Sequence, residues 1–90
     1  MRVHVNIKVS GRVQRIGFRY STMETARELG ICGFVQNLDD GSVYIEAEAP
    51  EDVIMAFIQW CRHGPVWAHV EHVNVEKGAL CNFDSFDIIR

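Results

Sequence analysis

The stretch Gly11-Arg12-Val13-Gln14-Arg15-Ile16-Gly17-Phe18-Arg19 joins a strand pattern to a helix pattern and decides how the chain begins to fold. It holds three arginines, two glycines and no acidic residue. A glycine-containing turn of this kind leaves backbone N–H groups free at the positive end of the helix dipole, where a phosphate binds well. The same dipole repels an arginine at the helix start, and a bound anion removes that conflict. The segment therefore predicts an anion site.

The residues on either side of this segment have clear periodicities. Over residues 3–9, valine or isoleucine alternates with a polar residue, which predicts a half-buried strand. Over residues 18–29, apolar side chains recur at near-helical spacing. This helix begins either at the start of that range or at Ser21, which would form a capping box with Glu24. Gly30 is placed to end it.

A β-hairpin is expected next. Residues 31–36 predict a second strand, in which Gly33 marks a place where another segment packs closely. Asn37-Leu38-Asp39-Asp40-Gly41 predicts the connection, because Asp-Gly favours a tight turn. Apolar and polar residues then alternate over residues 43–49, which predicts a third strand.

The remainder of the chain predicts a helix and two further strands. Pro50-Glu51-Asp52 is typical of a helix start, and Gly64-Pro65 ends that helix. Residues 68–75 predict a fourth strand whose alternation slips by one, as at a bulge. A loop is expected over residues 76–82, and Phe86-Asp87-Ile88 predicts a short final strand. The expected apolar helix face consists of Val53, Ile54, Phe57, Trp60 and Cys61.

This order of elements is strand, helix, strand, strand, helix, strand, and then one short strand. It predicts an α+β fold of the ferredoxin-like split βαβ type, a sandwich in which an antiparallel sheet carries two helices on one face. Ninety residues are enough for one domain, which we expect to span residues 1–90.

The charge is distributed unevenly along the chain. Residues 1–23 contain five basic residues and no acidic residue, whereas the other 67 contain four basic and twelve acidic residues. A cationic site on an acidic body suits a small anion better than nucleic acid, whose long phosphate backbone would meet repulsion outside the site. We therefore expect a small-molecule ligand and no nucleic-acid partner.

Composition also predicts the compartment. No apolar run reaches membrane-spanning length, and no signal-peptide pattern follows Met1. We expect a cytoplasmic protein with no membrane partner. Cys32, Cys61 and Cys81 are an odd number without Cys-x-x-Cys spacing, which favours idle thiols over a disulfide or a redox role.

The motif at residues 11–19 resembles the acylphosphatase signature Gly-x-Val-Gln-Gly-Val-x-Phe-Arg. It is neither a Walker A loop nor a phosphocysteine loop, since no Gly-Lys-Ser/Thr follows and no cysteine precedes Arg19. The resemblance extends over nearly all of the chain. Further matching segments are Ala26-x-x-Leu29-Gly30, Gly33-Phe34-Val35-x-Asn37, Asp40-Gly41-x-Val43, Gly64-Pro65 and Phe86-x-Ile88.

The resemblance implies a small enzyme, without metal or other cofactor, that hydrolyses the carboxyl-phosphate bond of acyl phosphates. It implies that Arg19 is the catalytic arginine that binds the phosphate and that Asn37 positions the attacking water. The residues expected to bind the substrate are Gln14, Arg15, Ile16, Gly17 and Phe18, chiefly through their backbone N–H groups. We expect a monomer.

Arg15 departs from this family pattern, which has glycine at that position. If the backbone there needs a positive φ, arginine costs about 1–2 kcal/mol and could tilt the N–H groups away from the phosphate. Its charge beside the anion would offset part of that cost. The alternative function is therefore a non-catalytic module that binds phosphate or acyl phosphate and has lost turnover.

Other candidate residues have simpler interpretations. Lys8 and Arg12 are expected to be solvated charges, and Asp39 and Asp40 to be turn residues. His69-x-x-His72 is not expected to bind metal, because residues three apart on a strand face opposite sides. A ferredoxin-like nucleic-acid binder would need a broader basic face and more exposed aromatic residues than the sequence provides.

Overall fold

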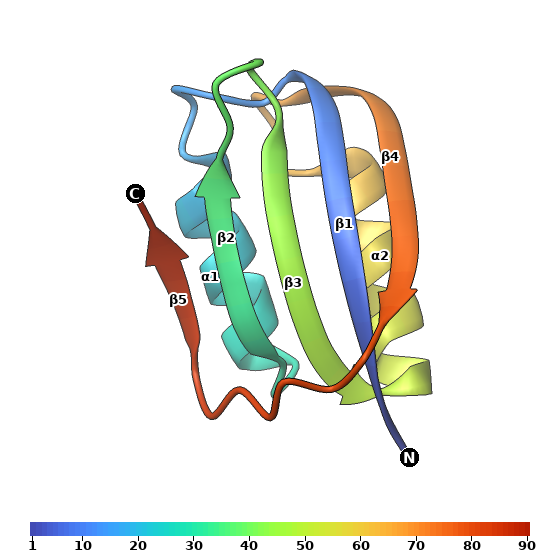
Figure 1. Ribbon diagram of the computed structural model, residues 1–90. Helices are drawn as coiled ribbons and strands as arrows, with labels where there is room; N and C mark the ends of the chain where they lie inside the picture. The colour runs from blue at the N-terminus through green and yellow to red at the C-terminus, as the bar shows by residue number, and fades with distance from the viewer.

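The computed structural model describes all residues, 1–90, as a five-stranded sheet with two helices packed on one face (Figure 1). Every predicted element is present, and the α+β fold is confirmed. The strands are β1 Arg2–Arg12, β2 Cys32–Asn37, β3 Val43–Pro50, β4 His69–Gly78 and β5 Phe86–Ile89, and the helices are α1 Phe18–Glu28 and α2 Glu51–His63. Neither helix has the length and hydropathy needed to cross a membrane.

The strand order is β4-β1-β3-β2-β5. The pairs β1–β3, β1–β4 and β2–β3 are antiparallel, as expected for a ferredoxin-like sheet. Strand β5 differs, because it pairs with β2 in parallel and makes the sheet mixed. The reason is the crossover, residues 79–85. Strand β4 ends where β2 begins, and the crossover follows that end of the sheet to the outer edge of β2 (Figure 1).

The core lies between the sheet and the helices. The alternation in β1 and β3 turns Val5, Ile7 and Ile45 toward the helices, where they are fully buried. Helix α2 meets them with Ile54 and Phe57, also fully buried. Each such side chain stabilises the fold by about 1.5–3 kcal/mol through its removal from water. This core fixes the face and register of every strand.

Helix α1 begins at Phe18, and Ser21 therefore lies inside it rather than at a capping box. Gly17 is the N-cap residue, with φ 78 and no side chain to satisfy the first N–H groups. Gly30 follows the helix with φ 73, as the sequence predicted. The start of α1 is thus uncapped by the protein itself.

Two local predictions about the sheet are confirmed and one is wrong. A Cβ on Gly33 would lie 1.8 Å from the Glu46 carbonyl oxygen, so strand β3 does pack closely there. The register of β1 against β4 shifts between Ser10 and Gly11, which is the expected bulge. Strand β4, however, continues to Gly78 because it pairs with β1 as far as His4, so the predicted loop over residues 76–82 begins later.

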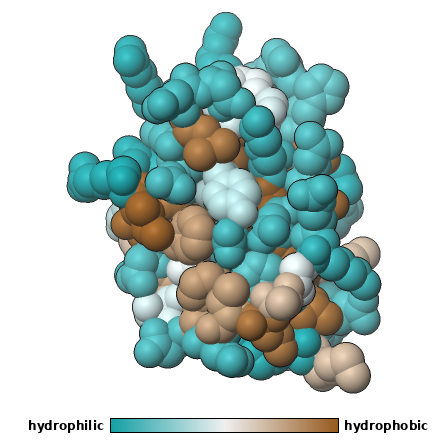
Figure 2. Space-filling view, viewed as in Figure 1, coloured by the Kyte–Doolittle hydropathy of each residue, from teal (hydrophilic) through white to brown (hydrophobic).

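The helix-free face is covered in part by the crossover. Figure 2 shows this face as largely hydrophilic with a few hydrophobic patches. His4 and Glu48 lie on it, and the alternation of β1 and β3 predicts that both are in contact with solvent. Both are buried instead, at 4% and 0% exposure, because residues 79–83 pass over them.

Candidate active site

One pocket, of about 160 Å³, is lined by residues of the loop after β1, the start of α1 and the ends of β2 and β5. Figure 1 shows these segments close together at its upper left. The pocket forms there because the core fixes the strand ends and the helix start side by side. Its lining residues are Val13, Arg15, Gly17, Phe18, Arg19, Tyr20, Asn37, Ile88 and Arg90. No acidic side chain is among them.

The backbone at the start of α1 provides a row of free donors. The first hydrogen bond of the helix runs from the Ser21 N–H to the Gly17 carbonyl, at 3.0 Å. The six N–H groups from Arg15 to Tyr20 donate to no backbone or side-chain acceptor. They lie at the positive end of the helix dipole, an arrangement that binds anions. This is the geometry that the sequence predicted.

The pocket is strongly cationic. Arg15, Arg19 and Arg90 line it, and none of the three is in an ion pair with an acidic residue. Arg19 lies in the first turn of α1, where its charge is unfavourable until an anion binds. Arg15 has φ 66, so arginine does occupy the left-handed backbone region here. The backbone strain anticipated for an arginine at this position is therefore present, and Arg15 still lines the pocket.

Asn37 has an unusual environment. It is the last residue of β2 and lines the pocket. Its Oδ1 atom is buried without a hydrogen-bond partner in the protein. A buried acceptor without a partner costs about 1–3 kcal/mol, and such atoms are uncommon in folded proteins. A water or ligand donor in the pocket would satisfy it.

Gln14 braces the loop against the β2–β3 hairpin. Its Nε2 donates to the carbonyl oxygens of Leu38 and Ser42, each at 2.8 Å. Ile16 is half-buried and packs against the core. Among the predicted substrate-binding residues, Arg15, Gly17 and Phe18 line the pocket, whereas the side chains of Gln14 and Ile16 hold the loop from behind.

Besides Asn37, three residues of the pocket lie outside the predicted motif. Tyr20 is one residue beyond the motif, and Ile88 and Arg90 arrive from the end of the chain through the parallel pairing of β5 with β2. Ile88 is marked only by the Phe86-x-Ile88 match, and no local pattern marks Arg90. Their place depends on the crossover, which the sequence predicted only as a loop.

Lys8 and Asp40, expected to be a solvated charge and a turn residue, form an ion pair. Lys8 Nζ lies 2.8 Å from Asp40 Oδ2, so this lysine neutralises the turn next to Asn37. The Lys8 hydrogen bond, with those from the Ser42 hydroxyl and N–H, holds the pKa of Asp40 well below its usual range. Cys32, Cys61 and Cys81 are free thiols, and burial raises the pKa of Cys61 to about 12. Cys61 is therefore unreactive.

The expectation that His69 and His72 face opposite sides of their strand was wrong. The bulge pairs His69 with Arg12 and His72 with Ser10, and these two partners share one face of β1. The two histidines therefore do not point apart. They still belong to no group of three metal-ligating side chains, because the group that the structure contains is His4, Glu48 and Cys81.

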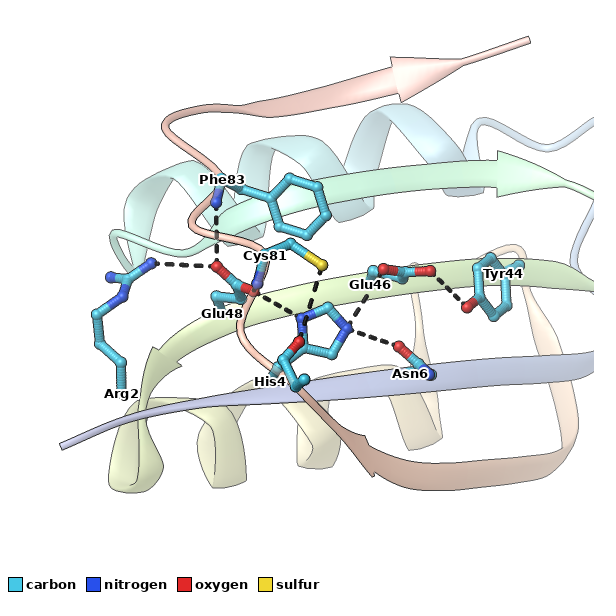
Figure 3. Close-up of polar contacts among 9 residues, drawn as sticks. Arg2, His4, Asn6, Tyr44, Glu46, Glu48, Cys81 and Phe83 are labelled. Atoms are coloured by element: carbon cyan, nitrogen blue, oxygen red, sulfur yellow. Dashed lines mark hydrogen bonds and ion pairs between the residues drawn. The ribbon is translucent and has the colours of Figure 1, made fainter.

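His4 and Glu48 form a second polar cluster, on the helix-free face (Figure 3). The His4 Nδ1–H donates to Glu48 Oε2 at 2.7 Å, and Nε2 lies 2.8 Å from Asn6 Oδ1. Burial alone would lower the pKa of His4. The hydrogen bonds to Glu48 and Asn6 and the charges of Glu46 and Glu48 outweigh it and raise that pKa.

Glu48 is the other half of this buried pair. Burial alone would raise its pKa. Hydrogen bonds from the backbone N–H groups of Cys81 and Phe83 and from the His4 ring outweigh burial and lower the pKa. The crossover is therefore held to the sheet by the buried Glu48 carboxylate, a contact that sequence alternation alone could not reveal.

Comparison with known proteins gives one consistent result. The acylphosphatase family model matches residues 5–88. An acylphosphatase of Pseudothermotoga lettingae is 48% identical over 92% of this chain and 93% of its own length. An acylphosphatase of Archaeoglobus fulgidus is 45% identical over 96% and 97% of the two chains.

A solved structure gives the same result for the fold. The crystal structure of the acylphosphatase from Bacillus subtilis superposes with a TM-score of 0.95 at 34% identity and covers 98% of this chain and 99% of that one. The loop, the strand order and the match over nearly the whole length thus agree. This chain belongs to the acylphosphatase family.

Proposed function

We propose that the pocket between the Gly11–Arg19 loop and Asn37 is the active site at which this acylphosphatase hydrolyses acyl phosphates to a carboxylate and inorganic phosphate. One observation carries the assignment of the site. The residues that line one cationic pocket include Asn37, whose Oδ1 has no partner, and five residues with free N–H groups, namely Arg15, Gly17, Phe18, Arg19 and Tyr20. The donors suit a phosphate, and the acceptor suits the water that attacks it.

The phosphoryl group of the substrate binds at the start of α1. The N–H groups at the start of α1 donate to its oxygens, and the Arg19 guanidinium holds two of them in a bidentate contact. Arg15 and Arg90 add positive charge around the group. Because phosphoryl transfer spreads negative charge over the equatorial oxygens, donors fixed in place before the reaction stabilise the transition state.

The water is positioned by Asn37. Its Oδ1 accepts a hydrogen bond from the water and holds it in line with the bond that breaks. The P–O bond to the acyl group breaks as the new P–O bond forms, and the electron pair leaves on the carboxylate. A carboxylate has a pKa near 4, so it departs without a proton. The proton of the water passes to a phosphate oxygen, so no protein base is needed.

Three further features belong to the proposal. The enzyme works as a monomer on a small acyl phosphate and not on nucleic acid. The helix-free sheet face argues against nucleic acid, because the Glu46 carboxylate lies beside its aromatic side chains, Phe34 and Tyr44. It needs no metal for hydrolysis. A cytoplasmic location agrees with three free thiols, which persist in a reducing compartment.

The direct test is steady-state hydrolysis of benzoyl phosphate in the presence of EDTA. Arg19→Ala is expected to lower kcat/KM by about 10³-fold or more, since it removes the principal contact to the transition-state charge. Arg12→Ala is the matched control, because this arginine lies outside the pocket. It should retain the rate of the wild-type protein.

The outcomes separate the two candidate functions. A wild-type rate equal to spontaneous hydrolysis, together with measurable phosphate affinity, would favour the non-catalytic module. Full activity of Arg19→Ala would remove Arg19 from the mechanism.

A further inference from the structure

Three side chains that commonly bind metal ions meet on the helix-free face, beside the crossover and at the opposite end of β1 from the reaction pocket. They are His4 from β1, Glu48 from β3 and Cys81 from the crossover (Figure 3). One ligand atom of each, namely a ring nitrogen, a carboxylate oxygen and the sulfur, lies within 4.8 Å of the other two. His4 and Glu48 are paired across β1 and β3, so the sheet itself fixes their separation.

The ring of His4 is already oriented for a metal at Nδ1. Its other nitrogen, Nε2, lies 2.8 Å from Asn6 Oδ1 and 3.3 Å from Glu46 Oε1. A histidine that binds a metal usually donates its second N–H to such an oxygen, which fixes the tautomer and the ring plane. Phe83 stacks on the ring at an interplanar angle of 28°, with centroids 6.0 Å apart.

Glu48 is held in the same way. Its Oε1 accepts from the Phe83 N–H at 3.1 Å and lies 3.8 Å from the Arg2 guanidinium. Its Oε2 accepts the Nδ1 proton of His4 at 2.7 Å, and the Cys81 N–H donates to the same oxygen. A metal ion can take the place of that proton, with the ligand atoms moving apart slightly to reach bond lengths of about 2.0–2.3 Å.

We propose that His4 Nδ1, a Glu48 carboxylate oxygen and Cys81 Sγ form a Zn²⁺ site, with water as the fourth ligand. Nitrogen, oxygen and thiolate sulfur are the donors that zinc takes in a tetrahedral site. Cys81 is exposed and gives the ion a path of entry, whereas His4 and Glu48 are buried. Binding releases the Nδ1 proton and the thiol proton.

The charges balance once zinc is bound. The Cys81 thiolate and the Glu48 carboxylate neutralise the two charges of the ion, and the histidine is neutral. The remaining neighbours, Glu46 and Arg2, have opposite charges. The site links β1, β3 and the crossover, and it takes no part in hydrolysis.

The test uses Co²⁺ as a spectroscopic substitute for zinc in the full-length, metal-free protein. We expect a thiolate-to-cobalt charge-transfer band and the intense visible bands of tetrahedral cobalt, both removed by added Zn²⁺. Cys81→Ser should lose the charge-transfer band. Cys32→Ser is the matched control. Cys32 lies on β2 and is paired with Glu48 on β3, but it is outside the cluster. This variant should keep the band.

Affinity and stability give a second measurement. Cys81→Ser should weaken Zn²⁺ binding more than tenfold, and Asn6→Ala should weaken it by about 10–100-fold while keeping the band, as loss of the group that orients a metal-bound histidine does. Zn²⁺ should raise the thermal midpoint of the wild-type protein and not that of Cys81→Ser. Benzoyl phosphate hydrolysis should be the same in Cys81→Ser and wild type.

The proposal is overturned if the wild-type protein gives no charge-transfer band, or if the band persists in Cys81→Ser. The proposal is also overturned if only Cys32→Ser loses the band, because the sulfur ligand would then be Cys32 on β2 and not Cys81.

Discussion

Asn37 is the residue whose geometry most clearly requires a partner, since its buried Oδ1 has none in the protein. Asn37→Ala should lower kcat for benzoyl phosphate by about 100-fold, as loss of one positioned polar group in an active site does. Inhibition by inorganic phosphate should be unchanged, because the proposed mechanism assigns phosphate binding to the N–H groups and Arg19. Gln36→Ala, one residue earlier and outside the pocket, should behave as wild type. An equal loss of phosphate affinity and kcat would contradict the assigned role.

Arg15 stores backbone strain at the edge of the pocket. With φ 66 it occupies a region that glycine adopts at little cost. Arg15→Gly should raise the free energy of unfolding by about 0.5–1 kcal/mol, the left-handed cost of arginine less the extra chain entropy of glycine. It should also raise KM, because a pocket guanidinium is lost. Urea unfolding and steady-state kinetics measure both effects.

The control for this variant is Arg12→Gly, at a strand position without positive φ. It should lower the free energy of unfolding. If Arg15→Gly lowers it as well, position 15 is not strained by arginine.

At the scale of elements, the Lys8–Asp40 ion pair joins β1 to the β2–β3 turn that follows Asn37. The pKa of Asp40 is lowered in the folded protein, so the pair stabilises the fold above the unfolded-state value of 3.8. This stabilisation is lost as the pH falls through the folded-state pKa. Lys8→Gln should therefore have a lower urea midpoint than wild type at pH 7, and the difference should vanish in strong acid.

Lys77→Gln is the matched control, because Lys77 is exposed and forms no ion pair with an acidic residue. Its midpoint should follow that of the wild-type protein at both pH values. A Lys8→Gln deficit that persists unchanged in strong acid would show that the effect comes from packing and not from charge.

The elements themselves were predictable because their signals are local. Alternation in β1 and β3, helical spacing in α1 and α2, and the Asp-Gly turn all depend on neighbours a few residues apart. The length of β4 and the parallel pairing of β5 were not predictable in this way. Both depend on where the far ends of β1 and β2 lie in the folded sheet.

At the scale of the whole molecule, the site residues that the sequence predicted lie in local motifs, and those that it did not predict depend on contacts between distant segments. Arg15 and Arg19 belong to one continuous motif, so the sequence predicted them. Arg90 and the buried state of His4 and Glu48 result from the path of the crossover, which brings distant segments to β2 and over the helix-free face. Alternation identifies which face a residue is on, but it does not show what later covers that face.

The central claim is that the free N–H groups at the start of α1, with Arg19, bind the phosphate. Titration of ¹⁵N-labelled protein with inorganic phosphate tests it most directly. The backbone amide signals from Arg15 to Tyr20 and the Asn37 side-chain amide should shift together with a single dissociation constant. Arg19→Ala should raise that dissociation constant strongly. Saturable shifts confined to other parts of the chain, or no shift at residues 15–20, would contradict the account.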